Sequence, residues 1–171
     1  MRAPLEAGAR FVLLDEAVEE LGLAEAERGL ERQWVYGPAP LPFDDATYES
    51  ANRSFEGIGL RPLSPVHPRA KRMANNAIRI SWIRRTRIGG DSWAGLDVPL
   101  GEEMEAYEVE ICDGDEVRRV LASNTAEVFY SAVDQEDDFG HAESSLLGVR
   151  IFQMSRAFGR GAARSARLHV E

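Results

Sequence analysis

The stretch EAYEVEICDGDEVRRVLAS, residues 105–123, decides the fold of this chain. Within it Tyr107, Val109 and Ile111 alternate with polar residues, which places the three apolar side chains on one face of a strand. The sequence DGDE at 113–116 supplies a glycine where a tight hairpin turn needs one. The stretch is therefore predicted to be an antiparallel β-hairpin with one buried face.

Short β-like segments of the same kind, separated by turn residues, continue on both sides of this hairpin. Such even spacing is typical of an all-β sandwich. In the second segment Ile78, Ile80 and Trp82 share one face, which we expect to point inward. The seven predicted strands lie at residues 66–73, 77–87, 105–114, 116–123, 126–134, 147–156 and 165–171.

The N-terminal third has a different character. We expect a strand at 11–14, a short helix after Asp15 and a second strand around Trp34. Because an isolated hairpin is marginally stable in water, this part looks like the end of a larger domain or an appendage.

Prolines and glycines are expected to interrupt regular structure between about residues 37 and 65, with the prolines at 38, 40 and 42. We therefore predict a small, mostly β segment at 1–58 and a β-sandwich domain at 59–171.

The composition excludes several classes of partner. The formal net charge of -9 disfavours nucleic acid, because that affinity depends on a surplus of Lys and Arg. No apolar run approaches the ~20 residues that span a bilayer, so no membrane insertion is expected. Cys112 is the only cysteine, so an internal disulfide is impossible and a cysteine zinc site lacks companions.

No catalytic residue, cofactor or metal site is predicted. The carboxylates at Asp134, Glu136, Asp137 and Asp138 could bind Ca²⁺, but their spacing does not match a calcium loop, and a solvated acidic loop is expected. The histidines lack metal-ligand spacing, and neither the serines nor Cys112 has a nucleophile signature.

The stretch ISWIRRTRIGGDSW, residues 80–93, concentrates arginines in an acidic chain. We expect its arginines and Arg79 to pair with glutamates of the third strand across the sheet, namely Glu105, Glu108 and Glu110. The alternative is that Arg85 and Arg87 contact an anionic partner or a glycan. Trp93 follows in a loop, where its ring could stack on a sugar, anchor an interface or pack over the end of the sandwich.

A tryptophan in the second strand, a tyrosine in the third and a penultimate strand that runs into a glycine-containing loop together resemble a fibronectin type III domain. Here these are Trp82, Tyr107 and VRIFQMSRAFGRG at 149–161. The resemblance implies a seven-stranded fibronectin type III-like β-sandwich with Trp82 and Tyr107 as core hallmarks.

A narrower resemblance covers nearly all of the chain. The segments GLRPLSPVHPRA (59–70), ISWIRRTRIGGDSW (80–93), DVPLGEEMEAYEVEI (97–111) and IFQMS (151–155) resemble the C-terminal part of the tail-tip hub proteins of gene transfer agents and related tailed phages. In that family the block follows a segment similar to RFVLLDEAVEELGL, ERQWVYGPA and DDATY, residues 10–23, 31–39 and 44–48.

This resemblance implies a non-enzymatic virion component that lies in the particle tail, after assembly in the cytoplasm. Its partners would be other tail or baseplate proteins and the recipient's envelope polysaccharide, and the full-length hub would be a homotrimer. Residues 1–58 would be the end of the hub domain, and the chain would be a C-terminal fragment or a truncated reading frame. The alternative is a stand-alone carbohydrate-binding or adhesion module that uses Trp93, Arg85 and Arg87.

Overall fold

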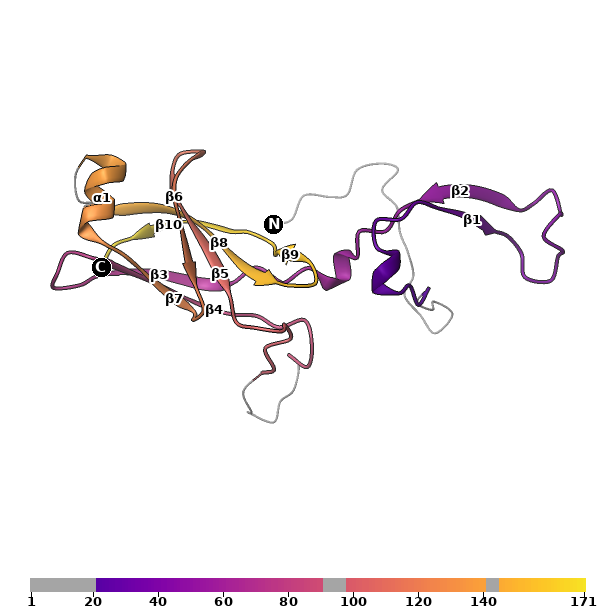
Figure 1. The fold of residues 1–171 in the computed structure, drawn as a ribbon, viewed down its shortest axis with the longest axis horizontal. Helices are drawn as coiled ribbons and strands as arrows, with labels where there is room; N and C mark the ends of the chain where they lie inside the picture. Colours follow the sequence, from indigo (N-terminus) through magenta and orange to yellow (C-terminus); the bar gives the residue numbers. More distant parts are fainter. Residues whose placement is uncertain (1–20, 91–97, 141–144) are drawn as a thin grey trace, which may run out of the picture. The chain divides into compact units, whose positions relative to one another are not determined.

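The computed structural model of the chain describes residues 21–90, 98–140 and 145–171. The chain divides into two compact units, Met1–Glu56 and Gly57–Glu171. The strand and helix expected within 11–23 fall mostly outside the described residues. Figure 1 labels the helices and strands.

The second unit is a sandwich of two antiparallel sheets (Figure 1). One has the order β3-β4-β7, and the other has the order β10-β8-β5-β6, with the short β9 pairing with β8. This arrangement confirms the predicted fold, a mainly β, fibronectin type III-like sandwich of seven principal strands. The seven principal strands are β3 Val66–Arg72, β4 Ile78–Ile83, β5 Tyr107–Asp113, β6 Glu116–Ser123, β7 Glu127–Tyr130, β8 Leu146–Ser155 and β10 Arg164–His169, and the short β9 is Gly159–Arg160.

The hairpin of β5 and β6 forms as its sequence predicts. Asp113 pairs with Glu116, and Gly114 adopts a left-handed conformation with φ 61° in the turn between them. Tyr107, Val109 and Ile111 are all buried. The alternation of apolar and polar residues therefore fixed which face of β5 lies in the core.

The core fills the space between the two sheets. From one sheet come Ile78, Ile80 and Trp82, and Trp82 is only 5% exposed. Tyr107, 1% exposed, meets the indole of Trp82 edge to face, with ring centroids 5.1 Å apart. From the second sheet, Val109, Ile111, Leu147, Val149 and Ile151 complete the contact.

A helix follows β7 where the sequence predicted the end of a strand and an acidic loop. Helix α1 spans Ala132–Phe139, so that prediction was wrong. The Ser131 side chain caps its first turn by accepting a hydrogen bond from the amide of Asp134, and Gly140 ends it in a left-handed conformation. No helix in the described part of the chain has the length and hydropathy to cross a membrane.

The chain beyond β10 joins the opposite sheet. Val170 forms a parallel bridge with Ala70 of β3. The amide of Arg72 donates to the carbonyl of Glu171 at 2.7 Å, and the amide of Glu171 donates to the carbonyl of Ala70 at 3.2 Å. The C-terminal segment therefore contacts both sheets of the sandwich.

The first unit contains a hairpin of β1 (Arg32–Tyr36) and β2 (Glu49–Arg53), after the single-turn helix η1 (Glu25–Glu27). The predicted strand around Trp34 is confirmed as β1. The prediction that regular structure stops between 37 and 65 was wrong, because β2 lies there, as does η2 (Ile58–Leu60) of the second unit.

This hairpin buries little. The rings of Trp34 and Phe55 pack edge to face at 5.5 Å, yet no side chain of residues 21–24 and 26–56 is fully buried. Several large apolar side chains are exposed, including Val35 and Phe43. A two-stranded sheet of this kind has no core of its own.

Candidate partner-contact surface

The loop after β4 begins with the arginine cluster that the sequence marks as a candidate contact surface. Arg84 donates to the carbonyl oxygens of Val98 and Pro99 at 2.6 and 3.0 Å. Arg85 donates from Nε to the carbonyl oxygen of Ser64 at 2.9 Å. These guanidinium groups therefore hold the long loop between β4 and β5 and the segment before β3.

Arg87 is bound in the same way. Its Nε lies 3.0 Å from Oε1 of Glu102, whose side chain is 3% exposed. The guanidinium also donates to the carbonyl oxygens of Gly59 and Gly101. With 19% of its side chain exposed, Arg87 has little surface left for a glycan or an anionic partner. Trp93 lies outside the described residues, so its role stays a prediction.

In the described part of the chain, the ion pairs expected between Arg79, Arg85 or Arg87 and the glutamates of the third strand do not form. The physical reason is topology: β4 and β5 lie in different sheets, so their side chains are not cross-strand neighbours. Arg79 instead pairs with Glu127 of β7, at 2.6 Å. Glu105 accepts a hydrogen bond from the hydroxyl of Tyr107 at 2.9 Å.

Glu108 and Glu110 pair with arginines from β8 and β9. Glu110, with 8% of its side chain exposed, lies 2.7 Å from Arg150 through one oxygen and 2.7 Å from Arg160 through the other. Arg160 also binds Glu108 and stacks over the ring of Phe152 at 4.4 Å. Its hydrogen bond to Glu108 is the main cause of the raised pKa of Arg160.

Two acidic residues of α1, Asp134 and Asp138, form ion pairs within the chain. Asp138 accepts from Nε and Nη2 of Arg119 at 2.7 and 3.0 Å and from the Tyr130 hydroxyl at 2.8 Å. The bonds from Arg119 lower the pKa of Asp138. Burial, followed by the bond to Asp138, raises the pKa of Tyr130. Asp134 pairs with Arg119 at 2.8 Å, so two of the four carboxylates considered for Ca²⁺ bind an arginine.

The described residues contain no group of three or more histidine, cysteine or acidic side chains placed to hold a metal ion. Cys112 is buried, and burial raises the pKa of its thiol. A raised pKa keeps the thiol protonated at neutral pH and therefore weakly nucleophilic.

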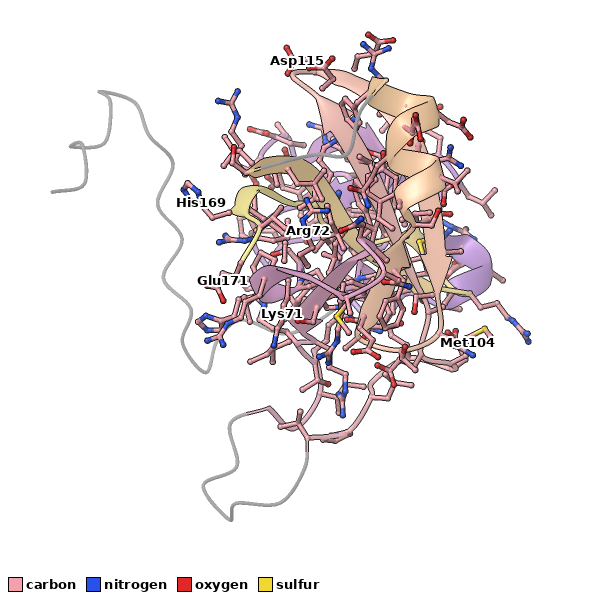
Figure 2. All side chains as sticks on the ribbon, turned by 90° about the vertical axis from the view of Figure 1, so that its left-hand side faces the viewer. Lys71, Arg72, Met104, Asp115, His169 and Glu171 are labelled. Atoms are coloured by element: carbon pink, nitrogen blue, oxygen red, sulfur yellow. The ribbon has the colours of Figure 1, made fainter. Side chains whose placement is uncertain are left out.

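A groove of about 570 Å³ lies beside the turn between β5 and β6, where β8 and β10 pair. Figure 2 labels Asp115 at this turn, next to the helix. Gly148 lies in the groove wall, and a side chain there would not fit, because a Cβ would lie 2.6 Å from the carbonyl oxygen of Cys112. This groove was not predictable from sequence, since its lining residues come from four separate segments. The polar members of its lining are Asp113, Asp115, Arg150, Ser165 and Arg167.

A second hollow of about 480 Å³ is lined by His67, Arg69, Ser81, Trp82 and Ile83. It lies where the pairing of β3 with β4 shifts register between Val66 and Arg69. His67 has a φ of 52° there, a left-handed conformation that is uncommon outside glycine.

Comparison with known proteins gives likenesses in structure alone. No protein-family model matches the sequence, and no curated protein matches it. The chain is similar to domains d3-d4 of the rat CD45 extracellular region, with 8% identity and a TM-score of 0.44, over 99% of this chain and 80% of that one. It is also similar to the FN5 domain of Drosophila Lar, with 13% identity and a TM-score of 0.35, over 64% of this chain and 96% of that one. At such values neither likeness carries a functional conclusion.

Proposed function

We propose that this chain is a non-enzymatic structural component of a phage-like tail tip or baseplate hub, of the gene transfer agent type. In this role the sandwich serves assembly and contact with the recipient's envelope. The support is the sequence resemblance together with one structural observation. The four segments that carry the resemblance in the sandwich bind one another.

Arginines and glutamates of these segments make the bonds. Arg85 joins the segment 80–93 to Ser64 in 59–70, and Arg87 joins it to Glu102 in 97–111. A backbone hydrogen bond of 2.8 Å from the amide of Met154 to the carbonyl oxygen of Ala106 joins 151–155 to 97–111. Glu103 also accepts hydrogen bonds from the amides of Arg156 and Ala157, directly after 151–155. The motif residues therefore form one connected framework at one end of the sandwich, as expected if the motifs specify a structural module.

The partners proposed with this function are other tail or baseplate proteins, with a homotrimer in the context of a full-length hub. The first unit has the properties of a segment that packs against a partner protein, because its hairpin exposes apolar residues such as Val35 and Phe43. The proposed location is the particle tail, after assembly in the cytoplasm.

Immunogold electron microscopy of purified particles tests the proposal, with an antibody raised against the second unit. We expect label at one end of the tail and recovery of tail proteins when the chain is affinity-purified from producing cells. Particles that carry no label, from cells that do contain the chain, would contradict the proposal.

The alternative is a stand-alone carbohydrate-binding or adhesion module that uses Trp93, Arg85 and Arg87. It is the weaker proposal, because Arg85 and Arg87 bind their own chain. A glycan array separates the two: binding that disappears on Trp93→Ala while the fold is retained would favour the alternative.

A further inference from the structure

The outer face of the sheet β10-β8-β5-β6 carries two neighbouring rows of side chains at the groove. Strand register places Arg167 of β10 and Cys112 of β5 on either side of Gly148. In the next row, Ser165 and Glu110 flank Arg150. Arg150 and Arg167 are thus diagonal neighbours on one face, where Cβ atoms lie roughly 7–8 Å apart. Between them the sheet has no side chain, because position 148 is glycine.

The two arginines differ in whether an acidic side chain neutralises their charge. Arg150 pairs through Nε with Glu110, and Glu110 is shared with Arg160. Arg167 is exposed, and no bond joins it to another residue in the described part of the chain. At the turn, the carboxylate of Asp113 lies 3.0 Å from Arg118.

We propose that Arg150 and Arg167 form a binding site for an oxyanion, a carboxylate or a phosphate group, over Gly148, with the hydroxyl of Ser165 as a further donor. Guanidinium groups bind such anions through paired, charge-assisted hydrogen bonds. The groove of about 570 Å³, which Arg150, Ser165 and Arg167 line, provides the space for the anion. Nε of Arg150 lies 2.7 Å from the Glu110 carboxylate, and the same arginine lines the groove.

The negative charge of Asp115 is expected to weaken anion binding in the groove. Asp115 lines the groove without an arginine partner among the described residues, and its negative charge opposes a bound anion. Removal of this charge should therefore strengthen binding, whereas removal of Arg167 should weaken it. This site does not depend on the proposed tail-tip function.

Nuclear magnetic resonance titration of the full chain tests the site, with inorganic phosphate and tri-galacturonate as separate probes at constant ionic strength. We expect saturable shifts of the Gly148 and Arg167 amides. Arg167→Ala should weaken binding about tenfold or more, because a hydrogen bond to a charged group contributes about 1.5–3 kcal/mol. Asp115→Asn should tighten it. Tighter binding of phosphate would identify a phosphate ligand, and tighter binding of tri-galacturonate would identify a carboxylated one.

Arg164→Ala is the matched control, since it removes the same charge from the same strand at an exposed position outside the groove lining. It should leave both affinities unchanged. Shifts that do not saturate with either probe would overturn the proposal. Equal weakening by Arg164→Ala and Arg167→Ala would also overturn it, because that result indicates general charge attraction. A melting temperature within a few degrees of the parent shows that each variant is folded.

Discussion

Trp82 is buried between the two sheets, and its indole meets Tyr107 edge to face. Trp82→Ala should lower the free energy of unfolding by about 3–5 kcal/mol, because it leaves a large cavity in the core. Urea denaturation followed by circular dichroism measures the change. Trp82→Phe keeps most of the ring and should cost less. A loss below about 1 kcal/mol for the alanine variant would contradict the assigned core role.

Asp138 should make stability depend on pH. Arg119 lowers the pKa of this carboxyl in the folded state from its ordinary value of 3.8. The contribution of ionised Asp138 to the free energy of unfolding is therefore present above the ordinary pKa. It is lost as the pH falls through the lowered pKa of the folded state. Asp138→Asn should destabilise the protein at pH 7 and reduce the further loss of stability on acidification.

Urea midpoints at pH 7 and pH 3 measure this effect. Asp137→Asn, at an exposed position on the same helix, serves as the control and should behave like the parent. The same pH profile for Asp138→Asn and the parent would show that the pair with Arg119 contributes nothing.

The stability of helix α1 depends on the N-cap residue Ser131. Ser131→Ala removes the side-chain acceptor for the Asp134 amide and should cost about 1 kcal/mol of unfolding free energy. Ser131→Thr retains a hydroxyl at the cap and should restore most of it. Thermal melts followed by circular dichroism distinguish the two variants, and equal melting temperatures would count against the cap.

Gly148 permits the close pairing of β8 with β5. Gly148→Ala should destabilise the sandwich by about 1–3 kcal/mol, because the added Cβ would lie 2.6 Å from the Cys112 carbonyl oxygen. The control is Gly59→Ala, where an added Cβ meets no atom within 4 Å. Urea denaturation of both variants measures the difference, and equal midpoints would refute the steric argument.

The strands were predictable from sequence because period-two alternation is a local signal, and five of the seven lie close to the predicted bounds. The second was predicted to reach residue 87 but ends at Ile83. The fifth was also predicted too long, since AEVFYSAVD continues the β-like pattern past Tyr130. Its end was readable in principle: Ser131 and Asp134 have capping-box spacing, and Gly140 follows as a stop. Strand β2, ESANR, escaped prediction because it has no large apolar residue, and its pairing with β1 alone makes it a strand.

The arginine partners were less predictable than the strands. Sequence order suggested that β4 and β5 pair, whereas the sandwich places them in different sheets. Pairing across a sheet depends on topology, which local patterns do not encode. The groove beside Gly148 was missed for the same reason, since its walls come from β5, α1, β8 and β10.

At the scale of the whole molecule, the stable core belongs to the second unit. All residues of the core cluster lie between Ala70 and Leu168. Residues 57–171 expressed alone should therefore unfold cooperatively with nearly the midpoint of the full chain. Residues 21–56 alone should give no cooperative transition, because their hairpin has no core. Calorimetry of both fragments is the measurement, and a second unit that fails to fold by itself would refute this division of stability.

The parallel bridge between Ala70 and Val170 has a mechanical consequence. When tension acts on the start of β3 and on the end of the chain, the two parallel segments are pulled in opposite directions along their length. The bonds from Arg72 to Glu171 and from Glu171 to Ala70 are then loaded together in shear and cannot open one after another. A sandwich tethered at these two points should therefore resist a pulling force better than one in which the last strand peels away from an edge.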